Sequence, residues 1–266
     1  MEDNLRNMHI DEDMKANLVI PNFPHDNPST NLSLSLVGRF LTDRQICTQI
    51  MKERMADVWQ PRRGEAIKEI ALGLFLFQFF HQIDMQRILK GGPWSFDCHL
   101  LILSTIKKGN ILSQVPLYTV PFWVQVHLLP VGFMSLIVGQ SIANYIGEFL
   151  DYDVKNSSDL WRSFMRIRVL IDVKKPLKKA KRIKKPDGEA TVVFFKYERL
   201  GTYYFFCGLL GHTDKNCDKL FNMEQDDGQR EWGPYLRADP RGATRGSVGY
   251  VQKIQIAGMR QSRNLT

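Results

Sequence analysis

Three side chains in the C-terminal part of the chain have types and a spacing that suit a metal ion. Cys207, His212 and Cys217 are separated from one another by four residues. Thiolate and imidazole are donors that Zn²⁺ prefers, and it usually takes four ligands in a tetrahedron. Gly208 and Gly211 lie in the same segment and can adopt the backbone conformations that so short a chain needs to fold around an ion. The spacing therefore predicts a zinc site.

The same segment resembles three quarters of a zinc knuckle, whose pattern is Cys-x2-Cys-x4-His-x4-Cys. The absent first cysteine would fall at position 204, where the sequence has Tyr204. A phenol has a reference pKa of about 10 and a thiol one of about 8.5, so ionising the tyrosine at neutral pH costs more free energy. Two interpretations stay open: a site that binds Zn²⁺ weakly, and a knuckle-derived loop that has lost its metal. A catalytic zinc site is disfavoured, because no general base stands at a suggestive spacing nearby.

Two features beside this segment suit single-stranded nucleic acid. Four consecutive aromatic residues precede the first cysteine and can stack on unpaired bases, with alternate rings expected to be buried. Eight cations fall within twelve residues, a density that suits contacts with phosphates. The predicted nucleic-acid-binding residues are Lys174, Lys175, Lys178, Lys179, Lys181, Arg182, Lys184, Lys185, Tyr203, Tyr204, Phe205 and Phe206. Alternatives for the cations are a solvated loop without a partner and a nuclear localisation patch; the alternative for the rings is packing onto the preceding hairpin.

The basic run accounts for the net charge of the chain. The 266 residues include 36 Lys and Arg against 28 Asp and Glu, a formal net charge of +8, so the chain outside those eight cations is formally neutral. Its composition, 44% hydrophobic and 24% charged, is that of a globular protein and excludes a wholly disordered or collagen-like chain. Concentrated positive charge favours a polyanionic partner.

The elements that must position these side chains are expected to begin after an acidic, disordered arm at residues 1–30. Residues 31–108 predict the order strand, helix, strand, strand, helix, strand, which is that of a ferredoxin-like (RRM-like) unit. The first strand is expected from residue 32 onward, where apolar residues alternate with small or polar ones.

Both helices of this unit carry candidate capping residues. Thr42 and Gln45 form a capping-box pattern for a helix over 43–58. Asp84 is the expected cap of the second helix.

Phe75, Phe77 and Phe79 are expected on one face of a central strand, where RNA-recognition domains stack bases. The other face of that strand is also apolar, so we expect it to be covered on both sides, with the second unit as a lid. Three tryptophans are interpreted in the same way as core anchors: Trp94, Trp123 and Trp161.

A second, smaller α+β unit is predicted over residues 121–200. Its expected elements are a strand at 122–129, a helix at 133–149 and a hairpin of strands 165–173 and 191–200, joined by a basic loop at 174–189. A degenerate CCHC zinc knuckle at 201–222 and a flexible basic tail at 241–266 follow.

Candidates for catalysis are few. Asp151 and Asp153 could pair as metal ligands, but no third carboxylate follows at a telling distance. Cys98 and His99 are adjacent on a predicted strand and so face opposite ways. Four cysteines without a secretory leader favour a reducing, intracellular setting. The basic run also allows a nuclear location. No apolar stretch reaches the ~20 residues of a membrane-spanning helix.

The chain from about residue 31 to 240 resembles a plant protein family related to the nucleic-acid-binding proteins of LINE-type retroelements. The resemblance is carried by YERLGTYYFFCGLLGHTDKNC at 197–217, LVGRFLT at 36–42, FLFQFFHQIDMQRILKGGPWSFD at 75–97, WVQVHLLP at 123–130 and the segment 232–238. It implies a domain of unknown function followed by a CCHC knuckle, with zinc and nucleic-acid binding.

The sequence thus predicts an α+β, retrotransposon-derived protein that binds single-stranded nucleic acid, RNA before DNA, without catalysis. The alternative is a scaffold that binds protein partners or itself, with the knuckle as a relic.

Overall fold

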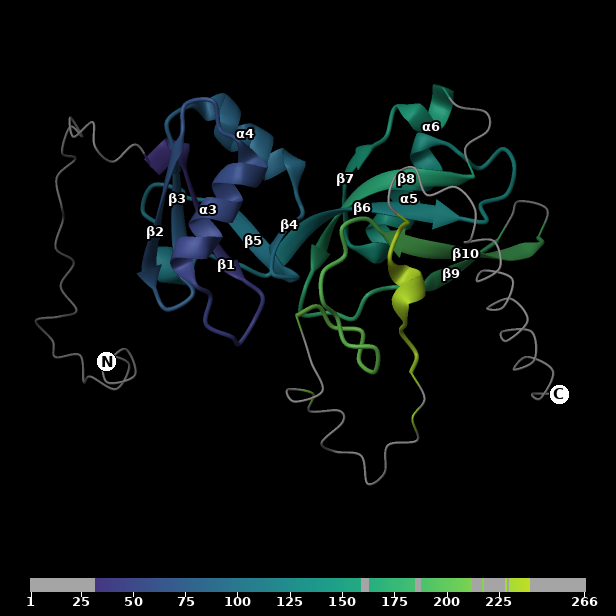
Figure 1. The fold of residues 1–266 in the computed structure, drawn as a ribbon. Coiled ribbons are helices and arrows are strands. Elements are labelled where there is room, and N and C mark those ends of the chain that lie inside the picture. Colours follow the sequence, from purple (N-terminus) through teal and green to yellow (C-terminus); the bar gives the residue numbers. More distant parts are fainter. Residues whose placement is uncertain are drawn as a thin grey trace, which may run out of the picture. The chain divides into compact units, whose positions relative to one another are not determined.

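The computed structural model describes residues 32–158, 163–184, 188–211, 217, 228 and 230–239, which belong to one compact unit. The predicted arm at 1–30 and tail at 241–266 lie outside these residues. The described chain is α+β, as the sequence predicted, and contains two five-stranded antiparallel sheets (Figure 1). No helix in this part of the chain has the length and apolar character to cross a membrane.

The first sheet has the strand order of a ferredoxin-like unit. Its elements are the 3₁₀ turn η1 (Leu32–Leu34), β1 (Ser35–Phe40), α3 (Thr48–Trp59), β2 (Glu65–Ala71), β3 (Leu74–Phe79), α4 (Gln82–Gly91), β4 (Trp94–Phe96) and β5 (His99–Thr105). The strands lie in the order β2-β3-β1-β5-β4. Without the short edge strand β4 this is the arrangement that the predicted element order implies.

The first helix begins later than predicted. Its N-cap is Cys47, which makes no side-chain capping bond. Thr42 instead accepts the backbone N–H of Arg44 at 3.1 Å, so its hydroxyl closes a local turn that competes with a cap. The capping-box prediction was therefore wrong, as was the strand start at residue 32, where the 3₁₀ turn precedes β1.

The predicted cap of the second helix is also wrong. His81 is the N-cap, and its Nδ1 accepts the N–H of Ile83 at 3.1 Å. Asp84 is buried in the first turn, where its carboxylate accepts the N–H of Arg63 at 3.2 Å. An acid in the first turn suits the positive end of the helix dipole, but here it also holds the preceding loop.

The end of the first unit contains a hairpin that the sequence analysis missed. Asp97 and Cys98 have φ angles of 47° and 62°, as a two-residue turn between antiparallel strands requires. The single last strand predicted for this unit is thus two strands, β4 and β5.

The core of this unit lies between the sheet and its helices. Phe75, Phe77 and Phe79 are fully buried there, and Trp59 contacts Phe77 at a ring-centroid distance of 5.4 Å. These rings therefore cannot stack on bases. On the opposite face, Leu100 and Ile102 of β5 join the core of the second unit. Leu74 and Leu76 of β3 are half-buried and do not belong to that core, so the expected lid covers β5 rather than β3.

The second sheet has more strands than predicted. Its elements are η2 (Leu112–Gln114), β6 (Thr119–His127), α5 (Leu136–Ile146), β7 (Glu148–Tyr152), α6 (Lys155–Ser158), β8 (Phe164–Asp172), β9 (Ala180–Lys184) and β10 (Ala190–Tyr197), followed by η4 (Pro234–Leu236). The strands lie in the order β7-β8-β6-β10-β9. Both edge strands, β7 and β9, were missed.

The helix of this unit is shorter than the predicted 133–149 because its end is fixed by packing. Ser135 caps its start by accepting the N–H of Val138. At its end, a Cβ on Gly147 would collide with the carbonyl of Leu170, so this residue must be glycine. The apolar residues that follow belong to β7.

One face of the second sheet is apolar and the other carries a charged network. Arg166 forms two hydrogen bonds of 2.8 Å with the carboxylate of Glu198 and a third bond of 3.1 Å with Asp153. Gln125 donates to Glu198 at 3.0 Å, and its amide oxygen accepts from Nε2 of His127 at 3.1 Å. Every buried charge in this network has a partner, as burial demands.

Burial, reinforced by the positive charge of Lys196, lowers the pKa of His127 from 6.5 to about 4. His127 therefore binds a proton near pH 6.5 in the unfolded chain, but in the folded chain it stays neutral until the pH approaches 4. We expect the stability held by neutral His127 to be complete above pH 6.5 and lost as the pH falls towards 4, by at most about 3 kcal/mol. Urea unfolding at pH 7 and pH 4.5 should show a smaller acid loss for His127→Gln than for the wild type. An equal loss would contradict the prediction, and His99→Gln serves as the control.

Candidate nucleic-acid interface

The segment around the predicted zinc ligands folds into a tight, closed turn. Tyr203 and Leu210 form an antiparallel bridge. Inside it, the N–H of Tyr204 donates to the carbonyl of Leu209 at 3.1 Å, and the N–H of Gly208 donates back to Tyr204 at 2.8 Å. We call residues 202–211 the knuckle turn.

The two glycines of the knuckle turn are required by both conformation and packing. Gly208 and Gly211 have φ angles of +73° and +64°, which L side chains rarely adopt. A Cβ at position 208 would collide with the indole of Trp232, and one at 211 with Leu41. The glycines therefore bend the turn and also let two other segments pack against it.

The structure brings two of the three predicted zinc ligands together. Cys207 and Cys217 are 1% and 0% exposed, and their thiols are close enough to interact. Burial, then the neighbouring Cys217, raises the pKa of the Cys207 thiol, and a bound cation would act in the opposite direction. His212 lies outside the described residues, and among those described no three metal-ligating side chains cluster. Two adjacent, buried thiols fit half of a zinc site.

The aromatic run separates into two pairs. Tyr203 contacts Phe205 at a centroid distance of 5.2 Å, and Tyr204 contacts Phe206 at 6.3 Å. Tyr203 is buried, its hydroxyl donates to the carbonyl of Gly233 at 2.5 Å, and Phe205 packs on the core of the second sheet. Burial raises the pKa of Tyr203 to about 12. Tyr204 and Phe206 are half-buried, so they are the pair with surface left for a base.

The predicted basic loop at 174–189 is partly an edge strand. Residues Ala180–Lys184 form β9, which pairs with β10 from Ala180↔Phe194 to Lys184↔Ala190. Ile183, half-buried against the core, anchors this strand. The long-loop interpretation was wrong because one apolar residue among cations gives too weak an alternation to predict a strand.

We call residues 174–185 the basic segment. Its described cations lie on two sides of this edge. Lys178 and Lys181 both lie over the ring of Tyr145, with ammonium-to-centroid distances of 5.5 and 4.2 Å. Arg182 and Lys184 are exposed, and since successive strand residues alternate, they share the opposite face from Lys181.

Several of these cations already have partners within the protein. Lys174 lies over the ring of Tyr118 at 4.8 Å, and Lys175 is 3.7 Å from the carboxylate of Asp172. Lys179 pairs with Glu231 at 2.9 Å. Such exposed contacts contribute little free energy each, so these lysines can exchange them for phosphates. Lys185 lies outside the described residues.

Backbone and side-chain contacts join the basic segment to the knuckle turn. The N–H of Leu177 donates to the carbonyl of Gly208 at 3.0 Å. Trp232 donates its indole N–H to the carbonyl of Leu177 at 2.8 Å, and Lys179 lies over the same indole at 4.5 Å. Two segments that are well separated in the sequence therefore pack together, and their cations and half-buried rings make up the candidate surface.

Sequence reasoning missed two arginines beside this surface. Arg199 follows β10, and Arg237 forms a parallel bridge with Tyr197. Both are exposed. No spacing pattern relates them in the sequence. They come together only because the chain returns to β10 after the knuckle.

Two family models match the chain. Residues 29–109 match a domain of unknown function (DUF4283), and residues 171–219 match a zinc knuckle. The chain carries a DUF4283 domain followed by a zinc knuckle. The knuckle match includes the basic segment, β9 and β10 as well as the three ligand candidates.

A relative from Arabidopsis thaliana, uncharacterized protein At4g02000, agrees with the plant family that the sequence resembles. It is 24% identical over 135 residues, which cover 51% of this chain. The aligned region spans 42% of the relative's own length.

We expect Tyr204→Cys to increase zinc affinity by at least about tenfold. Loss of a group that only hydrogen-bonds to a metal ligand already changes metal affinity by about 10- to 100-fold, and a direct thiolate ligand should contribute at least as much. The variant would complete the four-ligand pattern. Zinc content after dialysis against a graded chelator measures the change, and Tyr204→Phe controls for loss of the phenol. Equal absence of zinc from the wild type and Tyr204→Cys would exclude a metal site.

Proposed function

We propose that this protein binds single-stranded nucleic acid without catalysing a reaction. The observation that carries the proposal is the bond between Leu177 and Gly208, which fuses the basic segment and the knuckle turn into one surface. Zinc knuckles suit nucleic-acid binding, and the match to residues 171–219 covers both parts of that surface. Zn²⁺, when bound, would hold the turn in shape through Cys207, Cys217 and His212.

In the proposed mechanism the cations supply most of the affinity, and the aromatic rings contact the bases. Cations on both faces of β9 neutralise phosphates and release condensed counterions. The Tyr204 and Phe206 pair, half-buried beside them, offers ring surface for stacking. Stacking tolerates any base, because every base has a flat face.

Three finer points complete this proposal. RNA is the preferred partner over DNA, because knuckle aromatics suit the unpaired bases of RNA loops. The chain derives from a retrotransposon, as its sequence resemblance implies. It works inside the cell, where the thiols of the knuckle stay reduced.

Binding should depend steeply on salt. If four of the cations in the basic segment engage phosphates, a plot of log affinity against log salt should have a slope of about −3. Fluorescence anisotropy with a labelled oligouridylate and the matching oligothymidylate, across a salt series, measures this slope for RNA and DNA. An affinity that does not change with salt would contradict the electrostatic mechanism.

Replacing all eight cations of the basic segment by Gln should abolish retention on an RNA column. Smaller variants separate the two groups of cations. One is Lys178→Gln with Lys181→Gln, whose side chains lie over Tyr145, and the other is Arg182→Gln with Lys184→Gln on the opposite face of β9. Lys107→Gln with Lys108→Gln removes equal charge from an exposed loop and should leave retention unchanged. Full retention by the eightfold variant, folded by circular dichroism, would favour the scaffold alternative.

Exposed apolar side chains support protein binding as a second candidate function. Ile137 on α5 is 76% exposed, and Val131 and Val154, which precede and follow α5 in the sequence, are 102% and 81% exposed. Sedimentation equilibrium of the wild type and Ile137→Ser would detect self-association through this region. A monomer at all concentrations excludes self-assembly.

A further inference from the structure

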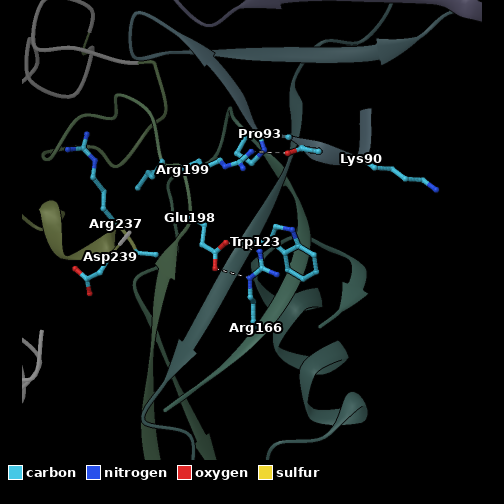
Figure 2. Close-up of a pocket in the computed structure, with 12 residues that line it drawn as sticks. Lys90, Pro93, Trp123, Arg166, Glu198, Arg199, Arg237 and Asp239 are labelled. Carbon is cyan, nitrogen blue, oxygen red and sulfur yellow. Dashed lines mark hydrogen bonds and ion pairs between the residues drawn. The ribbon is translucent and has the colours of Figure 1, made fainter. Parts of the chain in front are cut away.

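A groove made of two adjoining hollows lies where the end of α4 faces the second sheet. One hollow, of ≈ 580 Å³, is lined by Trp123 and Arg166 among others, and Figure 2 shows these side chains together with Glu198. The second, of ≈ 460 Å³, is lined by Trp94. Both share Pro93, Arg199, Leu200 and Arg237. Each hollow falls within the size range of small-ligand sites.

The charge of this groove is positive where the two hollows meet. In the larger hollow, Glu198 is already engaged by Arg166, and Asp239 pairs with Lys196 at 3.1 Å. Within the described part of the chain, neither Arg199 nor Arg237 forms an ion pair with an acid. Their hydrogen bonds go to neutral carbonyls, those of Gly91 at 3.0 Å and Gly201 at 3.3 Å.

Such bonds leave most of each guanidinium fork unused. A guanidinium has five N–H donors, of which a single carbonyl satisfies one. Arg199 and Arg237 are exposed, so these donors remain accessible to an anion from solvent. A phosphate matches the fork of an arginine geometrically.

An aromatic ring lies beside the charge in each hollow. Arg199 is 5.6 Å from the ring of Trp94, and Arg166 is 3.7 Å from that of Trp123. Both indoles are half-buried and line the groove, so they are more than the core anchors that the sequence predicted. In proteins that bind single strands, cations follow the phosphate backbone and aromatic side chains stack on the bases. Two hollows with a ring in each and cations shared between them have the same arrangement.

We propose that this groove holds two consecutive nucleotides of a single strand. Arg199 and Arg237 bind the phosphate that joins them. One base lies against Trp94, and the other lies against Trp123 with its stacked Arg166. The inference rests on the proposed function and adds to it a second contact site beside the knuckle turn, where Arg237 lies 5.5 Å from the ring of Tyr203.

The test compares three charge-matched variants with the wild type. The groove variant is Arg199→Gln with Arg237→Gln, the segment variant is Arg182→Gln with Lys184→Gln, and the control is Arg54→Gln with Arg62→Gln, two exposed arginines that line neither hollow. Affinity for a labelled oligouridylate is measured by anisotropy across a salt series. We expect the groove variant to bind at least about tenfold more weakly, with the slope of log affinity against log salt reduced in magnitude by about 0.7 for one lost phosphate contact.

A second set of measurements does not depend on the charge variants. Hydrogen exchange of the wild-type protein, with and without the oligouridylate, should show added protection at residues 91–95 and 199–201. Intrinsic fluorescence should be quenched on binding, and less so in Trp123→Phe.

The outcomes separate the two proposals. A groove variant that binds like the control, or no added protection at 91–95 and 199–201, overturns the groove while binding by the wild type upholds the proposed function. Wild-type protein that binds no oligouridylate overturns both. Weaker binding by the groove variant together with protection of the groove supports the inference.

Discussion

The packing of one tryptophan against one glycine organises the candidate interface. Trp232 lies against Gly208, where any Cβ would collide with its ring. Its indole N–H binds the carbonyl of Leu177, and Lys179 lies over its face. A bulkier residue at position 208 would therefore strain the knuckle turn and would also separate it from the basic segment.

The basic segment combines two physical roles. As an edge strand, β9 carries Lys181, Arg182 and Lys184 in a five-residue run, and charges on an edge strand prevent pairing with other chains. The same charges form the polyanion site that we propose. Stacking of two lysines on Tyr145 offsets part of their mutual repulsion, since cation–π contacts contribute about 0.5–1 kcal/mol at exposed sites.

Sequence patterns predicted the elements whose apolar residues keep a clear period. The ferredoxin-like order, the buried phenylalanines of β3 and the helix α5 all follow from spacing. Predictions failed where local and tertiary contacts compete. Thr42 closes a turn instead of capping a helix, Asp84 holds a loop, and β9 is a strand because it pairs with β10.

The sequence by itself determined the two α+β units, the concentration of positive charge and the spacing of the zinc-ligand candidates, because hydrophobic period, charge and ligand type are properties of neighbouring residues. Tertiary structure alone decided which of these residues meet. The joining of Leu177 to Gly208 and the pairing of Arg199 with Arg237 across two tryptophan-lined hollows depend on contacts between segments far apart in the chain. Such contacts arise from tertiary packing between distant segments, which leaves no periodic trace in the sequence.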